Sequence, residues 1–145
     1  MFEILLACSY LLEVGVMPID EYGKHLDKLF IKSPDNELLL ELEWHISDVQ
    51  KTINEIRVNC VNNTIDYNIF AKFLFDKLKK VYYQEKTDIK SFVSIICTIW
   101  KNLPDEIQFH QPFWTMNYAD DPLSWGDEQQ TRKLYEQMLN SYNEC

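Results

Sequence analysis

Hydrophobic positions along this 145-residue chain recur at intervals of three and four residues, the spacing of α-helices that bury one face. The pattern predicts a first helix over residues 1–14, which Gly15 ends. A second helix is expected to open at Pro18 and Asp20, because its apolar positions keep the helical spacing at Tyr22, Leu26, Leu29 and Phe30.

The third predicted helix is the longest. Its expected start is Ser33-Pro34-Asp35, which combines a capping hydroxyl, a Pro suited to the first helical position and an acid favoured by the helix dipole. Apolar residues then follow one face to about Asn59: Leu38, Leu39, Leu42, Ile46, Val49, Ile53 and Ile56. We therefore predict one helix of about 25 residues here.

Three further predicted helices each have residues able to cap their starts: Thr64 or Asp66, Thr87 or Asp88, and a capping box at Ser124 and Asp127. Only three Gly and five Pro are present, which leaves few residues for the turns of an all-β fold. We predict an all-α fold, a single domain over residues 1–145 built as a bundle or orthogonal array of five or six helices. The long connection 104–124 is expected to form a short strand or an aromatic lid.

Composition places the chain among folded proteins. Hydrophobic residues make up 46% of it, which argues against disorder. Cys8, Cys60, Cys97 and Cys145 are far apart, and no CxxC pair is present, so we expect small buried hydrophobes in a reducing compartment. No apolar run approaches the roughly 18–20 residues of a membrane span. The predicted location is cytoplasmic, without a membrane partner.

The net charge of −9 is concentrated in the C-terminal part of the chain. Residues 1–103 carry 15 acids and 12 bases, a net of −3, whereas residues 104–145 carry 8 acids and 2 bases, a net of −6. No Lys or Arg occurs from Asn102 to Thr131. Such a surface repels nucleic acid and attracts a basic protein, which is the predicted partner.

The stretch Phe113–Gln130 has four aromatic and four acidic residues and no base. It has two explanations. The aromatics could pin the connection onto the helices, with the acids in turns and at a helix start. Alternatively, they could anchor a basic partner that the acids attract, and the predicted partner-binding residues are then Trp114, Tyr118, Asp120, Asp121, Asp127 and Glu128. We expect the four acids to form one surface patch and Trp125, at the first position of the last helix, to be largely buried.

Candidate chemistry is sparse. A calcium loop starting at Asp121 would place Gly126 correctly, but Leu123, Trp125 and Arg132 would fall where oxygen ligands belong. The chain has no GxSxG, no glycine-rich phosphate loop and no His or Cys cluster with zinc spacing. We therefore predict no catalytic residue, no metal, no cofactor and no enzymatic activity.

An alternative prediction is a small enzyme or ligand-binding protein with a pocket under the aromatic loop 104–126. Its candidate polar groups are Glu41 and His45, four residues apart on one predicted helix face, together with His110. This alternative requires distant parts of the chain to converge.

The C-terminal run NYADDPLSWGDEQQ resembles the ending of a family of small uncharacterised acidic bacterial proteins. Proteins of similar size and acidity occur among the immunity proteins of polymorphic toxin systems. The resemblance implies a bacterial cytoplasmic protein with an immunity role, whose basic partner would be a toxin domain. It implies no catalytic residues.

Overall fold

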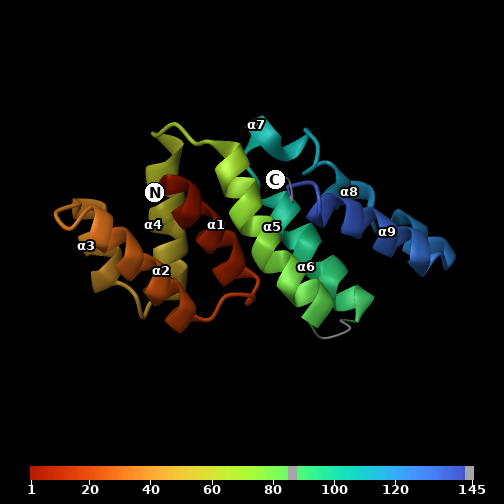
Figure 1. Ribbon diagram of the computed structural model, residues 1–145, viewed down its shortest axis with the longest axis horizontal. Coiled ribbons are helices and arrows are strands. Elements are labelled where there is room, and N and C mark those ends of the chain that lie inside the picture. Colours follow the sequence, from red (N-terminus) through yellow and green to blue (C-terminus); the bar gives the residue numbers. More distant parts are fainter. Residues whose placement is uncertain (85–87, 143–145) are drawn as a thin grey trace. The chain divides into compact units, whose positions relative to one another are not determined.

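The computed structural model of the chain describes residues 1–84 and 88–142. Within these ranges the chain forms nine α-helices and one 3-10 helix and no strand (Figure 1). The all-α prediction is confirmed, and the helices outnumber the five or six expected. Contacts along the chain group into two compact units, residues 1–74 and 75–145, so the boundary falls inside one helix, α5 (Tyr67–Gln84). The prediction of a single domain stays a prediction.

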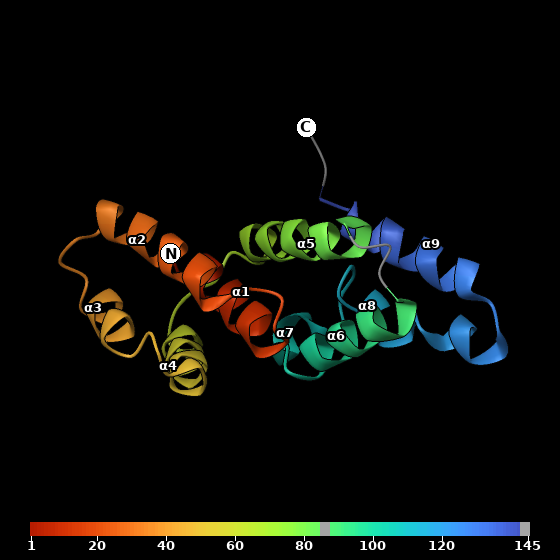
Figure 2. The ribbon, with the colours of Figure 1, turned by 90° about the horizontal axis from the view of Figure 1, so that it is seen from below.

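The first unit holds four helices and the start of α5: α1 (Phe2–Glu13), α2 (Ile19–Lys32), α3 (Glu37–Trp44) and α4 (Val49–Val61). α1 packs against α4 and α2, and α3 packs against the same two helices (Figures 1 and 2). Every residue of α1 from Leu5 to Leu12 is buried, so this helix is central to the unit. The expected stop at Gly15 is confirmed, because its φ of +77° is a left-handed value that favours glycine.

The predicted start of the third helix at Ser33-Pro34-Asp35 is wrong. Ser33 instead ends α2, since its N–H donates to the carbonyls of Leu29 and Phe30. α3 begins at Glu37, where the Asn36 side chain accepts a hydrogen bond from the N–H of Leu39 at 3.2 Å. An Asx cap just downstream of the Ser-Pro pair therefore sets the boundary.

The prediction of one long third helix is also wrong, because the helix is interrupted: α3 ends at Trp44 and α4 begins at Val49. The Asp48 side chain accepts a hydrogen bond from the N–H of Lys51 at 3.1 Å and caps α4. The buried hydroxyl of Thr52 donates to the His45 carbonyl at 3.0 Å and so satisfies the end of α3. Among the described residues, the longest helix is α5, with 18 residues. It starts where predicted, and the Asp66 carboxylate accepts from the N–H of Asn68.

The second unit holds the rest of α5 and α6 (Ile89–Lys101), α7 (Asp105–Gln108), α8 (Thr115–Tyr118), the 3-10 helix η1 (Asp121–Trp125) and α9 (Glu128–Leu139). α8 packs against both α6 and α9, and η1 packs against α9. Asp88 caps α6 by accepting from the N–H of Lys90, whereas the other predicted cap, Thr87, lies outside the described residues. Phe75, Leu78, Phe92, Ile96 and Tyr135 are buried in this unit.

The connection 104–124 contains short helices, so the strand that was one of its two predicted forms is wrong. Ile107, Phe113 and Met116 are buried, which ties the connection to the unit. Residue Phe109 is the exception, because most of its side chain is exposed. None of the helices in residues 1–84 and 88–142 has both the length and the apolar character needed to cross a lipid bilayer.

Candidate functional site

Four aromatic side chains from three short segments of the second unit form one cluster: Trp100, Phe109, Trp114 and Tyr118. Ring centroids lie 6.1 Å apart for Trp100 and Phe109, 5.9 Å for Trp100 and Trp114, and 5.5 Å for Phe109 and Trp114. Tyr118 joins the cluster through Trp114 at 6.5 Å. The edge-on and tilted arrangements are those that aromatic quadrupoles favour. We call these four residues the aromatic cluster.

A reciprocal pair of hydrogen bonds holds one side of the aromatic cluster. The Trp100 indole Nε1 donates to the Gln108 carbonyl at 2.9 Å, and the Gln108 Nε2 donates to the Trp100 carbonyl at 2.9 Å. The two bonds join the last turn of α6 to the end of α7. They fix the Trp100 ring, and Phe109 directly follows Gln108.

A second set of hydrogen bonds holds the Tyr118 side of the cluster. The buried Thr115 hydroxyl donates to the Gln111 Oε1 at 2.7 Å, and the Gln111 Nε2 donates to the Tyr118 hydroxyl at 3.3 Å. These bonds connect the segment before α8 with its last residue. The aromatic cluster is therefore braced at both ends by side-chain hydrogen bonds.

The aromatic cluster is open to solvent. Phe109 is 61% exposed even though it contacts two Trp rings, and the neighbouring His110 is exposed. Trp100 and Trp114 are half-buried. A large apolar ring held at the surface by fixed neighbours is the kind of group that anchors protein interfaces. Two acids, Asp105 and Glu106, are exposed on α7 just before it.

Two of the four predicted acids have local structural roles. Asp127 caps α9, since its Oδ1 accepts from the N–H of Gln130 at 3.0 Å. Glu128 pairs with Arg132 at 2.8 Å between Oε2 and Nε. Both acids are exposed. Asp127 thus interacts with the start of α9, and Glu128 interacts with the guanidinium of Arg132.

The other two acids differ in burial. Asp121 is exposed in η1, whereas Asp120 is half-buried. Burial raises the pKa of the Cys97 thiol, and the negative charge of Asp120 raises it further. Within the described part of the chain, no hydrogen bond or ring contact joins any of the four acids to the aromatic cluster. The structure thus brings Trp114 and Tyr118 together, and the grouping of the acids with them stays a prediction.

The prediction that Trp125 is largely buried is wrong, because its side chain is 69% exposed. Ser124 does not cap the last helix either: its hydroxyl donates to the Asp121 carbonyl at 2.7 Å. Since the cap is Asp127, α9 begins at Glu128, and Trp125 precedes the helix at the end of η1. Gly126, with a φ of +85°, makes the left-handed turn between the two.

Trp100 and Phe109 were missing from the predicted site. Trp100 belongs to the apolar face of a predicted helix, and its role depends on a contact between α6 and the connection that follows it. The available signal was the charge pattern, because Phe109 lies in the stretch without Lys or Arg, three and four residues after two acids. The nearby acids indicate that Phe109 lies at the surface, although a Phe side chain is more often buried.

The residues of the alternative prediction fall in both units. In the first unit, the His45 N–H donates to the Glu41 carbonyl at 3.3 Å at the end of α3. His110 belongs to the second unit, and its convergence with His45 stays a prediction. In residues 1–84 and 88–142, no three or more His, Cys, Asp or Glu side chains are arranged to hold a metal ion.

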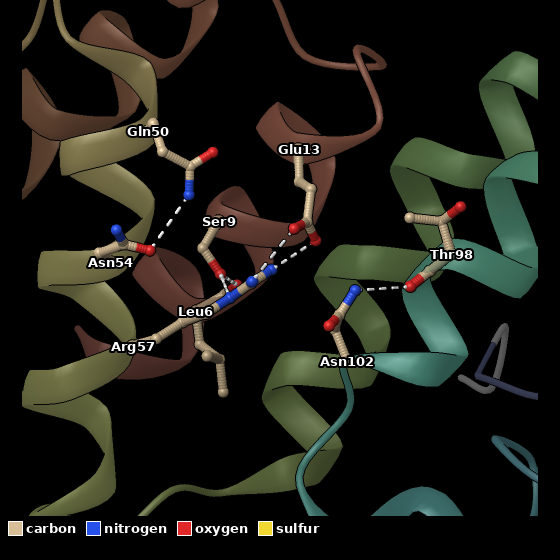
Figure 3. Close-up of polar contacts among 8 residues, drawn as sticks. All are labelled: Leu6, Ser9, Glu13, Gln50, Asn54, Arg57, Thr98 and Asn102. Atoms are coloured by element: carbon tan, nitrogen blue, oxygen red, sulfur yellow. Dashed lines mark hydrogen bonds and ion pairs between the residues drawn. The ribbon is translucent and has the colours of Figure 1, made fainter.

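A polar centre in the first unit joins α4 to α1 (Figure 3). The Arg57 Nη2 donates to the Glu13 Oε1 at 2.9 Å, and its Nε donates to the Ser9 hydroxyl at 3.2 Å. Its guanidinium carbon lies 4.3 Å from the centroid of the Tyr10 ring. Ser9 in turn donates to the Leu6 carbonyl of its own helix at 2.6 Å. The contacts of Arg57 thus tie α4 to α1. Figure 3 also shows two hydrogen bonds between residues four apart, Gln50 to Asn54 and Asn102 to Thr98.

No family model matches this chain, and neither does a curated protein or a solved structure.

Proposed function

We propose that this chain is a non-enzymatic acidic binding module whose partner is a basic protein. The observation that carries the proposal is the aromatic cluster with Phe109 at its exposed point. An exposed aromatic ring supported by fixed Trp neighbours can be buried by a partner with little loss of side-chain entropy. The side-chain hydrogen bonds of Gln108 and Gln111 supply that support.

The negative charge around the aromatic cluster predicts that the partner is positively charged. From Asn102 to Thr131 the chain has no Lys or Arg, and Asp105, Glu106 and Asp121 are exposed in this stretch. A basic surface would be attracted to it over several ångströms, and association would be faster at low ionic strength. We further propose that the partner is a toxin domain and that the chain is a bacterial cytoplasmic immunity protein. The resemblance of residues 117–130 to small acidic bacterial proteins supports this more specific proposal.

The first test is genetic and then biochemical. The neighbouring reading frame should encode a large toxin that ends in a basic domain, and that domain should co-purify with the chain when the two are expressed together. Isothermal titration calorimetry should then give a Phe109→Gln variant an affinity at least about tenfold lower, near 1.4 kcal/mol.

A matched control separates this effect from a general loss of apolar surface. Val61 is 82% exposed in the first unit, and a Val61→Gln variant should bind the partner as the native chain does. The circular dichroism spectra of both variants should equal that of the native chain. The proposal is wrong if no basic protein co-purifies, or if Phe109→Gln binds with native affinity.

The arrangement of helices belongs to the proposal as well. We infer a bundle or orthogonal array within each unit, supported by the packing of α1 against α4 and of α8 against α6 and α9. Interproton distances measured by NMR between these helix pairs would test it.

A further inference from the structure

The outer face of α3 exposes two large apolar side chains on successive turns. Leu40 is 51% exposed and Trp44 is 81% exposed. Leu39 and Leu42 of the same helix are fully buried, and α3 packs against α2 and α4. Residues four apart in a helix lie on one face, about 6 Å from each other. Leu40 and Trp44 thus form an apolar stripe opposite the buried side of α3.

The segment of the chain that carries this stripe is acidic. From Ser33 to Gln50 the chain has five acids and no Lys or Arg, and all five are exposed: Asp35, Glu37, Glu41, Glu43 and Asp48. Glu37 and Glu41 flank the stripe, because Glu37 precedes Leu40 by three positions and Glu41 precedes Trp44 by three. An exposed apolar pair within a segment whose charged side chains are all acidic has the features of a protein interaction site.

We propose that this face of α3, which we call the α3 face, docks an amphipathic helix of a partner protein that carries Lys or Arg on both sides of an apolar stripe. The partner's apolar residues would cover Leu40 and Trp44, and its cations would face the acids. The Trp44 ring can also hold a Lys or Arg side chain against its face by a cation–π interaction. The α3 face lies in the first unit, so the proposal does not rest on the aromatic cluster of the second.

The charge of the α3 face argues against other occupants. A symmetric contact between two copies of the chain would place each set of five acids against the same set. Nucleic acid and anionic lipid carry the same sign as this surface and would be repelled. A basic helix is the occupant that satisfies both the apolar pair and the charge.

The test uses the full chain and two synthetic peptides of equal composition. In one, Leu and Lys are ordered so that a helix has an apolar stripe between two rows of Lys. In the other, the order removes the stripe. We expect calorimetry at low salt to show that the native chain binds the first peptide at least about tenfold more tightly than the second.

Variants of the chain locate the binding. Trp44→Gln and Leu40→Gln should reduce the affinity for the first peptide to that for the second. Glu37→Gln combined with Glu41→Gln should weaken binding mainly at low salt, because screening by added salt already removes that contribution in the native chain. Val61→Gln is the matched control in the same unit, and Phe109→Gln is the control for the proposed function; both should leave the peptide affinity unchanged.

Several results would overturn the proposal. Equal binding of the two peptides would mean that only net charge attracts them. Native affinity in Trp44→Gln, or a loss confined to Phe109→Gln, would place the binding elsewhere on the chain. A native dimer that Trp44→Gln dissociates in sedimentation experiments would identify a second copy as the occupant.

Discussion

At the scale of single residues, the Arg57 side chain contacts three residues of α1. It bonds to Glu13 and Ser9, and it lies against the Tyr10 ring. Arg57 and Glu13 are each only 25% exposed in their side chains. Losing one partner would leave the other charge poorly solvated.

We therefore expect Arg57→Met to lower the free energy of unfolding by about 2 kcal/mol in urea titrations. Arg132→Met is the matched control, since Arg132 pairs with Glu128, whose side chain is 52% exposed, and its guanidinium carbon lies 5.8 Å from the centroid of the Tyr82 ring. An exposed pair four residues apart contributes only about 0.5 kcal/mol. Equal effects of the two substitutions would contradict the structural role of Arg57.

Glu55 predicts a pH dependence of stability. Burial raises the pKa of this carboxyl, and the neighbouring charge of Glu41 raises it further, against smaller opposing effects of His45 and Lys51. Its Oε2 atom is shielded from solvent and has no hydrogen-bond partner within the described residues. A raised pKa means that the folded chain holds the proton more tightly than the unfolded chain does. The stability that results is present below the unfolded pKa and is lost as the pH rises through the folded pKa.

A neutral side chain at position 55 cannot ionise, so it avoids this loss of folding stability at high pH. We expect Glu55→Gln to unfold at a higher urea concentration than the native chain at pH 7 to 8, and the difference to disappear near pH 4. Glu37→Gln removes the same charge from an exposed position of α3 and controls for net charge. A destabilised Glu55→Gln at pH 8 would show that the ionised carboxylate is favoured in the folded chain.

At the scale of elements, the start of α9 depends on one side chain. Asp127 accepts from the N–H of Gln130, whereas the Ser124 hydroxyl bonds within η1. We expect Asp127→Ala to lower the free energy of unfolding by about 1 kcal/mol. Ser124→Ala, at an exposed position, should change it by less than about 0.5 kcal/mol. If urea titrations instead showed a larger loss of stability in Ser124→Ala than in Asp127→Ala, Ser124 would be the cap, as the sequence pattern predicted.

The elements also show what the sequence can predict. Helical periodicity and side-chain caps correctly placed α1, α2 and the starts of α5 and α6, because these signals lie within a few residues of each other. The break between α3 and α4 was missed for a physical reason. The apolar period continues across it, and the bonds that stabilise it come from Asp48 and Thr52, which a pattern of apolar positions ignores.

The candidate site was predictable only in part. The charge pattern drew attention to the segment that contains Trp114 and Tyr118, whose ring centroids lie 6.5 Å apart. Trp100 and Phe109 join them through packing between α6 and the following connection, and no local pattern encodes that packing. The exposure of Trp125 was missed because a three-residue shift in the start of α9 moved it out of the helix.

At the scale of the whole molecule, charge is distributed so that both proposed surfaces are acidic. The stretches Ser33–Gln50 and Asn102–Thr131 contain no Lys or Arg, while the net charge of the chain is −9. The bases are placed elsewhere, four of them on α5 at Lys72, Lys77, Lys79 and Lys80. The first stretch lies in the first unit and the second stretch in the second unit, so the two proposed surfaces can be tested separately.

The last prediction tests whether local charge, beyond net charge, speeds association with the basic partner. One variant replaces Asp120, Asp121 and Asp127 with Asn and Glu128 with Gln. Asn can still cap α9, so the circular dichroism spectrum and unfolding midpoint should stay close to native. We expect a lower association rate constant in stopped-flow experiments, most clearly at low salt, with little change in the dissociation rate constant.

The matched variant removes four exposed acids from outside both acidic stretches, by changing Asp20, Asp27, Asp76 and Asp88 to Asn. Asp88 is a helix cap like Asp127, so each variant changes one cap to Asn. If both variants slow association equally, long-range net charge alone attracts the partner. If neither does, the carboxylates of residues 120–128 serve only the turn and the start of α9. A larger effect of the first variant would assign the attraction to that segment, since the two variants differ in where the charge lies and not in how much is removed.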